Sequence, residues 1–362
     1  MSAAELAGPV LVVGAGFMGT SVGLALRRAG HRVHLSDRSP AHLRTAVELG
    51  AGTDEEPADV ALVVVAVPPE ALAAAAAQAL ARWTDAVVTD IGSVKGPPLA
   101  RLLAQGVEVS RYVGSHPMAG SERSGPATAT ADLFDGRAWA VTPHPSAAPH
   151  AVAQVAALAR TCGAGVVELS TSEHDAAVAR VSHLPHLMSV LTAAQLAGSP
   201  SRYLALSGQG LRDVTRVAAG DPAMWRQIVL ANATEIAALL TAVRADLDRL
   251  LGALEPDGTS PPPASEALFA TLSRGNAGRQ LIPGKHGAPA ADEATVYVQV
   301  PDRPGELARL FADAGQSGVN VEDLHIDHDP ARPVGLVQLV VRRDSAARLT
   351  DALEARGWVV HP

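Results

Sequence analysis

The sequence has almost no cysteine. Cys162 is the single one in 362 residues, which excludes an internal disulfide and any zinc or iron–sulfur site built from several thiolates. Basic residues are also missing before Arg27, where a secretory signal would carry them ahead of its apolar core. We therefore expect a protein of the reducing cytoplasm, with no metal centre.

The sequence also lacks an excess of basic residues. Its formal net charge is -8 and its pI is near 5.9, so we do not expect it to bind the phosphate backbone of a nucleic acid. Two uncharged stretches, 6–26 and 181–201, have the length of a membrane span. The first holds five glycines and a proline and the second holds two histidines and two prolines, so we expect no membrane-spanning segment.

The predicted elements change character along the chain. Up to about residue 170, short β-branched runs alternate with helical stretches; the runs are 10–13, 32–36, 60–67, 86–90, 138–142 and 165–169. This alternation is typical of an α/β fold with a doubly wound parallel sheet. From 172 to 254 apolar residues recur at helical spacing, and Ser172 to Asp175 has the pattern of a capping box. The uniformly apolar stretch 187–196 predicts a helix buried on all sides, for instance at a dimer interface.

The last seventy residues follow the order strand, helix, strand, strand, helix, strand. The segments are 295–300, 305–317, 319–327, 334–342, 345–356 and 358–360, which is the ferredoxin-like order. Stretches rich in proline and glycine at 255–263 and 282–292 indicate linkers. We therefore predict a dinucleotide-binding Rossmann domain (8–171), an all-helical substrate and dimerisation domain (172–283), a linker (284–292) and a ferredoxin-like domain (293–362).

A glycine-rich loop follows the first predicted strand. Its residues are Gly14, Ala15, Gly16, Phe17, Met18 and Gly19, a G-x-G-x-x-G pattern. Such a loop brings the backbone close to a pyrophosphate, and the helix that we expect from Thr20 offers its free N–H groups. Asp37 lies at the end of the second strand, where an acid binds the ribose and favours NAD over NADP, although Arg38 could counter that preference. Val67 is expected near the nicotinamide half.

Two further polar segments lie at predicted strand ends. His116 is the candidate base for oxidation of an alcohol, because neutral imidazole accepts a proton near pH 7. Arg212 and Arg216 are four residues apart, so they share a helix face and could bind carboxylates. Several residues also have a purely structural interpretation. Lys95 could cap a helix and His183 could be a packing histidine. Trp225 is expected in the core of a dimer interface rather than in contact with the substrate.

Five segments together resemble one enzyme family. GAGFMGTS, TDIGSVKG, GSHPMAGSE, SHLPH and LRDVTRVAAGDPAMW, in this order, are similar to the prephenate dehydrogenases of tyrosine biosynthesis. The resemblance covers roughly 8–283 and implies an NAD-dependent homodimer that converts prephenate to 4-hydroxyphenylpyruvate by oxidative decarboxylation. The tail looks like an ACT regulatory domain, as found on some members.

The resemblance also implies roles for single residues. His116 matches the catalytic histidine, Ser93 its supporting serine, and Arg216 the arginine that binds the substrate. Residues matching the substrate pocket are Ser182, His186, Glu122 and Arg212. In the tail, Asp302, Gly305 and Asn320 match positions at which paired ACT domains bind an amino acid, for which tyrosine or a related aromatic is expected; a module that only dimerises is the alternative.

Three other functions share some of these sequence features. Arogenate dehydrogenase differs in its substrate by one amino group and shares these motifs. A β-hydroxyacid dehydrogenase has a similar glycine loop, but it would need a catalytic lysine in the helical domain, and none lies between Lys95 and Lys285. A regulatory protein that senses cofactor and amino acids would have no use for His116, Ser93 and Arg216 together.

Overall fold

The structure is a computed structural model, and it describes residues 5–120, 124–254, 262–282, 293–328 and 334–361. The chain forms two compact units, Met1–Val243 and Arg244–Pro362. The predicted linkers fall largely on 255–261 and 283–292, outside the described residues.

A parallel four-stranded sheet opens the first unit. Its strands are β1 (Val10–Val13), β2 (Val33–Ser36), β3 (Leu62–Val65) and β4 (Val87–Asp90), in the order β2-β1-β3-β4. The helices that follow these strands are α1 (Phe17–Arg28), α2 (Pro40–Glu48), α3 (Pro69–Arg82) and α4 (Gly96–Ala104). The predicted strand–helix alternation is confirmed, with each strand starting or ending at most two residues from its predicted bounds.

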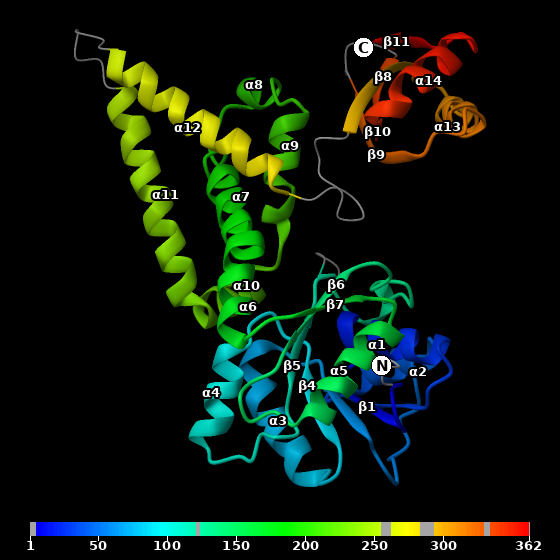
Figure 1. Cartoon of the computed structure of the whole chain (residues 1–362), viewed down its shortest axis with the longest axis vertical. Coiled ribbons are helices and arrows are strands. Elements are labelled where there is room, and N and C mark those ends of the chain that lie inside the picture. Colours follow the sequence, from blue (N-terminus) through cyan, green and yellow to red (C-terminus); the bar gives the residue numbers. More distant parts are fainter. Residues whose placement is uncertain (1–4, 121–123, 255–261, 283–292, 329–333, 362) are drawn as a thin grey trace. The chain divides into compact units, whose positions relative to one another are not determined.

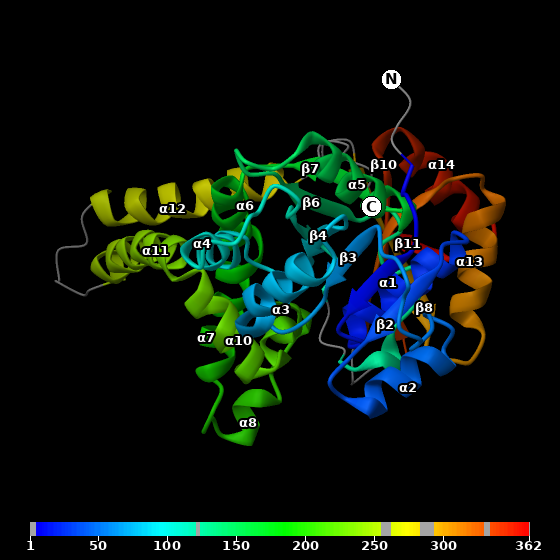
Figure 2. The same cartoon turned by 90° about the horizontal axis from the view of Figure 1, so that it is seen from below.

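Alternate residues of the strands pack into two separate cores. Val10 and Val12 belong to the core shared with α1 and α5 (Pro149–Thr161), whereas Leu11 belongs to the core shared with α3 and α4. Side chains alternate between the faces of a strand, so burial on both faces requires helices on both. Figures 1 and 2 show α3 and α4 on one side of the strands and α1 and α5 on the other.

A second, three-stranded sheet interrupts the predicted parallel arrangement. β5 (Gly114–Pro117), β6 (Ala138–Thr142) and β7 (Gly165–Glu168) lie in this order, with β5 antiparallel to β6 and β6 parallel to β7. The sequence pattern missed β5 as a strand. A parallel bridge between Val88 and Tyr112 places β5 beside β4, so both strands end at the same edge.

The helical part begins slightly before its predicted start. Its first helix is α6 (Thr171–Val178), and the capping box is formed by Ser170 and Glu173 rather than by Ser172 and Asp175. A π-helical turn (Ala179–His183) joins α6 to α7 (Leu184–Ala194). The remaining helices are α8 (Ser201–Leu204), α9 (Gln209–Thr215), a 3-10 turn (Arg216–Ala219), α10 (Pro222–Ala231) and α11 (Ala233–Leu254).

Helix α7 is not buried on all sides within one chain. Only His186 and Ser189 of this helix are buried, and Leu191 is 52% exposed. The expectation of full burial is therefore wrong for the single chain. Among the described residues no single helix is long and apolar enough to cross a membrane; α10 and α11 meet that test only together, across a 94° bend.

The second unit contains α12 (Pro262–Gln280) and an antiparallel sheet. The sheet has the order β11-β8-β10-β9, formed by β8 (Glu293–Pro301), β9 (Val321–His328), β10 (Val334–Arg342) and β11 (Val359–His361). Two helices, α13 (Glu306–Gln316) and α14 (Arg343–Glu354), cross between the strands. The order of strands and helices is the one that the sequence predicted. Leu310, Leu349 and Leu353 close a single core against the sheet.

Candidate active site

The glycine loop between β1 and α1 has the shape of a phosphate-binding turn. Gly14 has φ +106°, and a Cβ there would meet the Ala66 carbonyl oxygen at 2.4 Å, while a Cβ at Gly19 would lie 1.8 Å from the Gly14 oxygen. A Cβ at Gly16 would meet open space. Packing therefore requires glycine at Gly14 and Gly19, whereas Gly16 leaves room for a ligand above the backbone.

Helix α1 begins three residues earlier than predicted. Gly16 is its N-cap residue, and Phe17, Met18 and Gly19 form the first turn instead of preceding the helix. No side chain caps this end and no acidic residue lies in the first turn, so its N–H groups are available to phosphate oxygens. These residues fit the pyrophosphate of NAD.

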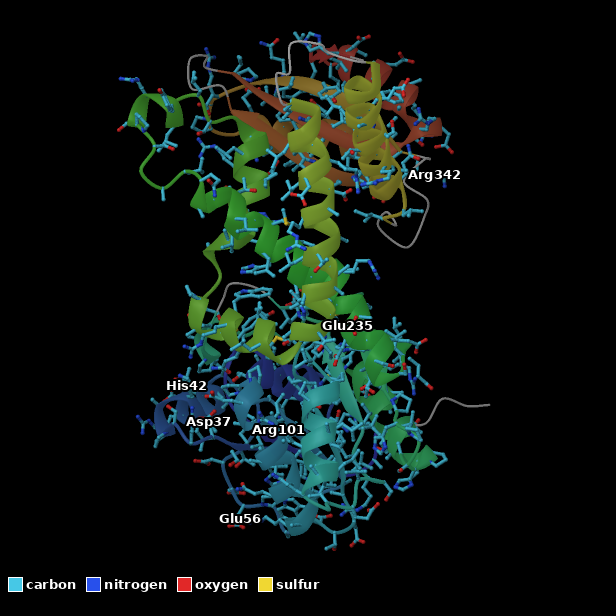
Figure 3. The ribbon with its side chains drawn as sticks, turned by 90° about the vertical axis from the view of Figure 1, so that its left-hand side faces the viewer. Asp37, His42, Glu56, Arg101, Glu235 and Arg342 are labelled. Carbon is cyan, nitrogen blue, oxygen red and sulfur yellow. The ribbon has the colours of Figure 1, made fainter. Side chains whose placement is uncertain are left out.

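Asp37 supports the same loop. Its Oδ2 accepts a hydrogen bond from the Ala15 N–H at 2.6 Å and its Oδ1 accepts one from the Ser39 N–H at 2.6 Å. The half-buried carboxylate therefore fixes the loop to the end of β2, at the place where a ribose-binding acid is expected. Figure 3 labels Asp37 beside His42 of α2. Val67 is half-buried beyond β3, close to where a Cβ on Gly14 would lie.

His116 lies near the end of β5, at the same sheet edge as the glycine loop and the loop after β4. Its Nδ1 is 3.0 Å from Nε2 of His174, and Nδ1 of His174 is 2.8 Å from Oδ1 of Asp175. His174 and Asp175 are both buried on α6. The sequence reasoning did not single out either residue for the site, although a histidine directly followed by an aspartate was a usable signal.

Asp175 also holds the start of α4. Its two carboxylate oxygens accept hydrogen bonds from the N–H groups of Lys95 and Gly96, each at 2.8 Å. Burial alone would raise the pKa of Asp175, but the hydrogen bonds from His174, Gly96 and Lys95 lower it below its usual range. The carboxylate is thus ionised and caps α4 from a different element.

Lys95 does not cap that helix with its side chain. The ammonium is completely buried, pairs with Asp90 and donates to the Ser115 carbonyl oxygen at 2.7 Å. Burial lowers the pKa of Lys95, while Asp90 opposes that effect. Asp90 also accepts a hydrogen bond from the Tyr112 hydroxyl at 2.6 Å. Since Ser115 directly precedes His116, this buried group supports the strand that carries the candidate base.

The imidazole of His116 is kept neutral by its surroundings. Burial lowers the pKa of His116 well below its ordinary value, and the positive charges that His174, Lys95 and His183 can carry lower it further. Burial likewise lowers the pKa of His183 to about 4. His183 lies 3.2 Å from the Asn232 side-chain amide nitrogen, which agrees with its reading as a packing histidine.

His186 and Trp225 form a stacked pair. Their ring centroids are 3.5 Å apart and their planes differ by 5°. Gly220 lies against both rings, because a Cβ on it would meet the indole at 2.5 Å. The 3-10 turn over Arg216–Ala219 packs against α7, the helix of His186. Trp225 therefore contacts a predicted pocket residue within its own chain.

The other predicted site residues lie on separate elements. Ser93 is half-buried on the loop after β4, and Ser182 is half-buried in the π-helical turn before His183. Arg212 and Arg216 are both exposed, on α9 and directly after it. Glu122 lies outside the described residues. No group of three or more His, Cys, Asp or Glu side chains in the described ranges could hold a metal ion.

Comparison with known proteins identifies the family of this chain. Residues 22–168 match the family described as "Prephenate dehydrogenase, nucleotide-binding domain", and residues 170–271 match "Prephenate dehydrogenase, dimerization domain". A probable prephenate dehydrogenase, NovF, of Streptomyces niveus is 37% identical to this chain, and the match covers 96% of this chain and 98% of NovF. The chain belongs to the prephenate dehydrogenase family.

Two solved structures show the same fold. The prephenate dehydrogenase of Aquifex aeolicus, crystallised with hydroxyphenyl propionate and NAD+, is 29% identical with a TM-score of 0.67, and the match covers 75% of this chain and 97% of that one. The arogenate dehydrogenase of Synechocystis is 25% identical with a TM-score of 0.61, over 74% and 99% of the two chains. The chain is thus an NAD-dependent oxidoreductase of the prephenate dehydrogenase family.

Proposed function

We propose that this protein oxidises and decarboxylates prephenate to 4-hydroxyphenylpyruvate, with NAD as hydride acceptor. The observation that carries the proposal is the neutral His116 imidazole at the sheet edge of the glycine loop, in a chain of this family. Bound NAD would supply the hydride acceptor at its nicotinamide ring. Gly14, Gly16, Gly19 and the first turn of α1 would hold its pyrophosphate, and Asp37 its ribose.

His116 would act on the ring hydroxyl of the substrate. Its imidazole accepts the hydroxyl proton as the hydride leaves the same carbon. The ketone that forms withdraws electrons from the bond to the ring carboxylate, which leaves as carbon dioxide. The ring becomes aromatic, and the oxygen takes back a proton as the phenol forms. Ser93, on the neighbouring loop, would support the hydroxyl.

Arg216 would bind a substrate carboxylate, and we assign Arg212, Ser182, His186 and Glu122 to the same substrate pocket. We expect Arg216→Ala to raise KM for prephenate by about 10- to 10²-fold, because a charge-assisted hydrogen bond contributes about 1.5–3 kcal/mol. The dissociation constant of NAD should stay the same, since the glycine loop is untouched. Steady-state kinetics and NAD titration measure the two. An equal loss of NAD binding would point to misfolding instead.

Arogenate is the alternative substrate, and the similarity to the Synechocystis enzyme supports it. Arogenate carries an ammonium where prephenate carries the side-chain ketone, so the two differ only far from the reacting ring. Initial rates of NADH formation with each compound, at matched concentrations, separate them. We expect faster turnover of prephenate. Turnover of arogenate alone would assign the chain to the other activity.

We propose a homodimer formed through the helical domain, which we place over 172–283. The exposure of Leu191 on the apolar helix α7 and the match to the dimerisation domain support it. We also propose that the protein is cytoplasmic, because its one cysteine, Cys162, cannot form an internal disulfide.

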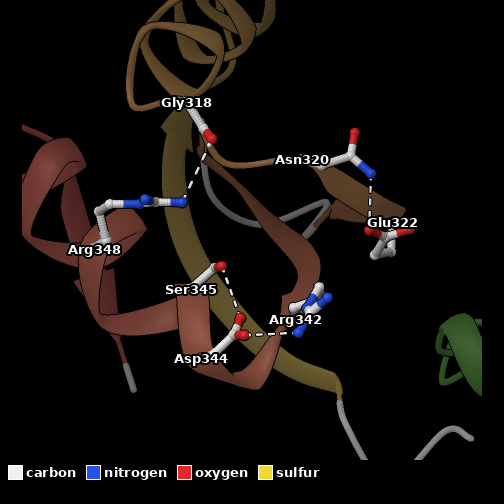
Figure 4. A pocket seen from close by; sticks show the side chains of 7 residues that line it. All are labelled: Gly318, Asn320, Glu322, Arg342, Asp344, Ser345 and Arg348. Carbon is white, nitrogen blue, oxygen red and sulfur yellow. Dashed lines mark hydrogen bonds and ion pairs between the residues drawn. The ribbon is translucent and has the colours of Figure 1, made fainter.

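The C-terminal domain, which we place over 293–362, is proposed to be ACT-like and to bind an amino acid. A polar cavity of about 570 Å³ lies beside α14; its lining residues are Gly318, Asn320, Glu322, Arg342, Asp344, Ser345 and Arg348 (Figure 4). Asn320 donates to Glu322 at 2.8 Å. Side chains of both charges suit a zwitterion. Asp302 and Gly305 do not line this cavity.

We expect Asn320→Ala to weaken inhibition by tyrosine. Loss of one or two hydrogen bonds should raise the half-inhibitory concentration about 10-fold, measured at saturating prephenate so that competition at the catalytic site does not contribute. Asp302→Ala, which alters the other predicted position, shows whether the ligand uses that turn as well. Inhibition curves that coincide with wild type in both variants would leave the module a dimerisation element.

A further inference from the structure

The side-chain contacts behind His116 determine which of its ring nitrogens can act as the base. A neutral imidazole carries its proton on one nitrogen and a lone pair on the other. His116 uses Nδ1 toward His174, so the nitrogen left to meet a substrate is Nε2. Nε2 can accept a proton only when the hydrogen of His116 is on Nδ1.

The carboxylate of Asp175 determines where the hydrogens lie in this series of contacts. Its oxygens already accept the N–H groups of Lys95 and Gly96, and an ionised carboxylate can only accept. Nδ1 of His174, 2.8 Å from Oδ1, must therefore be the donor. In a neutral His174 the lone pair is then on Nε2, which must accept from Nδ1 of His116.

We propose that His174 is a positioning residue, which with Asp175 holds His116 in the tautomer that has its hydrogen on Nδ1 and its lone pair on Nε2. This inference rests on the proposed function, because it assigns the nitrogen that takes the substrate's proton. The same contacts stabilise the imidazolium that forms, since Nδ1 of His116 keeps its acceptor in His174 after Nε2 is protonated.

The surroundings of His174 suit such a role. Its side chain is 1% exposed and its ring meets the His116 ring edge-on, with centroids 5.2 Å apart. The main chain of α6 is anchored next to it, because the Asn232 amide donates to the Asp175 carbonyl oxygen at 2.8 Å. A second imidazole thus separates the base from the carboxylate, so His116 does not itself contact a negative charge through this chain.

Two substitutions at His174 separate positioning from packing. Glutamine can place its amide oxygen near the position of the histidine Nε2 and still accept from His116, whereas leucine fills the space without an acceptor. We expect His174→Leu to lower kcat by about 10- to 10²-fold with KM for prephenate nearly unchanged, and His174→Gln to keep most of the activity. NAD affinity and the thermal melting temperature show that both variants fold.

The tautomer of His116 is measured by NMR in the absence of substrate. In the full-length protein labelled with ¹⁵N-histidine, the signals of His116 are those missing from the His116→Asn variant, and their shifts show which nitrogen carries hydrogen. We expect hydrogen on Nδ1 in wild type and in His174→Gln, and on Nε2 in much of the His174→Leu population.

The results distinguish two kinds of failure. Hydrogen on Nε2 of His116 in wild type, or equal kcat in the leucine and glutamine variants, would overturn the positioning role. Hydrogen on Nδ1 in a protein that turns over neither prephenate nor arogenate would instead overturn the proposed function.

Discussion

Replacing His116 with asparagine should nearly abolish turnover. Asparagine can form hydrogen bonds from a similar position but cannot accept a proton, so we expect kcat for prephenate to fall by about 10²- to 10⁴-fold while KM changes little. In wild type, kcat/KM should fall as the pH drops through the pKa of His116. Because burial lowers that pKa well below its ordinary value, this fall should lie on the acid side of the usual histidine range.

The control is a histidine on the surface. His42 is exposed on α2, so His42→Asn should leave both kinetic constants unchanged. The two variants are compared by initial rates of NADH formation between mildly acidic and neutral pH. Near-normal kcat in His116→Asn would remove this residue from the chemistry.

Of the substitutions proposed for this protein, Lys95→Met should lower the free energy of unfolding most. The substitution removes the ammonium from a fully buried ion pair and leaves the Asp90 carboxylate without its charge partner. Breaking a buried pair in this way lowers the free energy of unfolding by about 3–5 kcal/mol. The Tyr112 hydroxyl and the Gly92 N–H still donate to Asp90, which favours the lower end of that range.

A surface ion pair supplies the comparison. Arg28 pairs with Asp135 at 2.6 Å, and both side chains are more than 40% exposed. Exposed pairs contribute about 0–1 kcal/mol, so Arg28→Met should shift the midpoint of urea unfolding far less than Lys95→Met. Equal midpoints for the two variants would show that the buried lysine contributes no more than a surface charge.

The strand–helix alternation and the glycine loop of the candidate cofactor site could be predicted from the sequence because their signals are local. Gly14, Gly16 and Gly19 lie within six residues, and Asp37 follows at the end of the next strand. The unbroken apolar run of β1 and the alanine-rich stretch of α3 likewise need only neighbouring residues. β5 escaped prediction because its residues, Gly-Ser-His-Pro, lack the β-branched side chains that mark a strand.

The contacts that hold His116 could not be predicted from local sequence patterns. His116 and His174 are 58 positions apart, and Lys95 and Asp175 are 80 apart, so only the tertiary packing of α6 joins them. The pattern from Ser172 to Asp175 also predicted a capping box, which gave Asp175 a local role. The real box uses Ser170 and Glu173, and Asp175 is thereby free to accept from His174 and from the start of α4.

The pocket residues were predicted by resemblance and only partly grouped by the structure. His186 is buried, stacks on Trp225 and lies on the helix against which the turn of Arg216 packs. Arg212 and Arg216 remain exposed, as expected for long side chains that need a ligand carboxylate to fix one rotamer. The roles proposed for them depend on substrate binding rather than on contacts within the chain.

The most direct test of the central claim is a balance of products in one time course with prephenate and NAD+. NADH, carbon dioxide and 4-hydroxyphenylpyruvate are measured in the same samples, with His116→Asn as the control. The proposed chemistry predicts equal amounts of all three at every time and almost none in the variant. NADH formed without carbon dioxide, or no NADH from prephenate by a protein that binds NAD+, would contradict it.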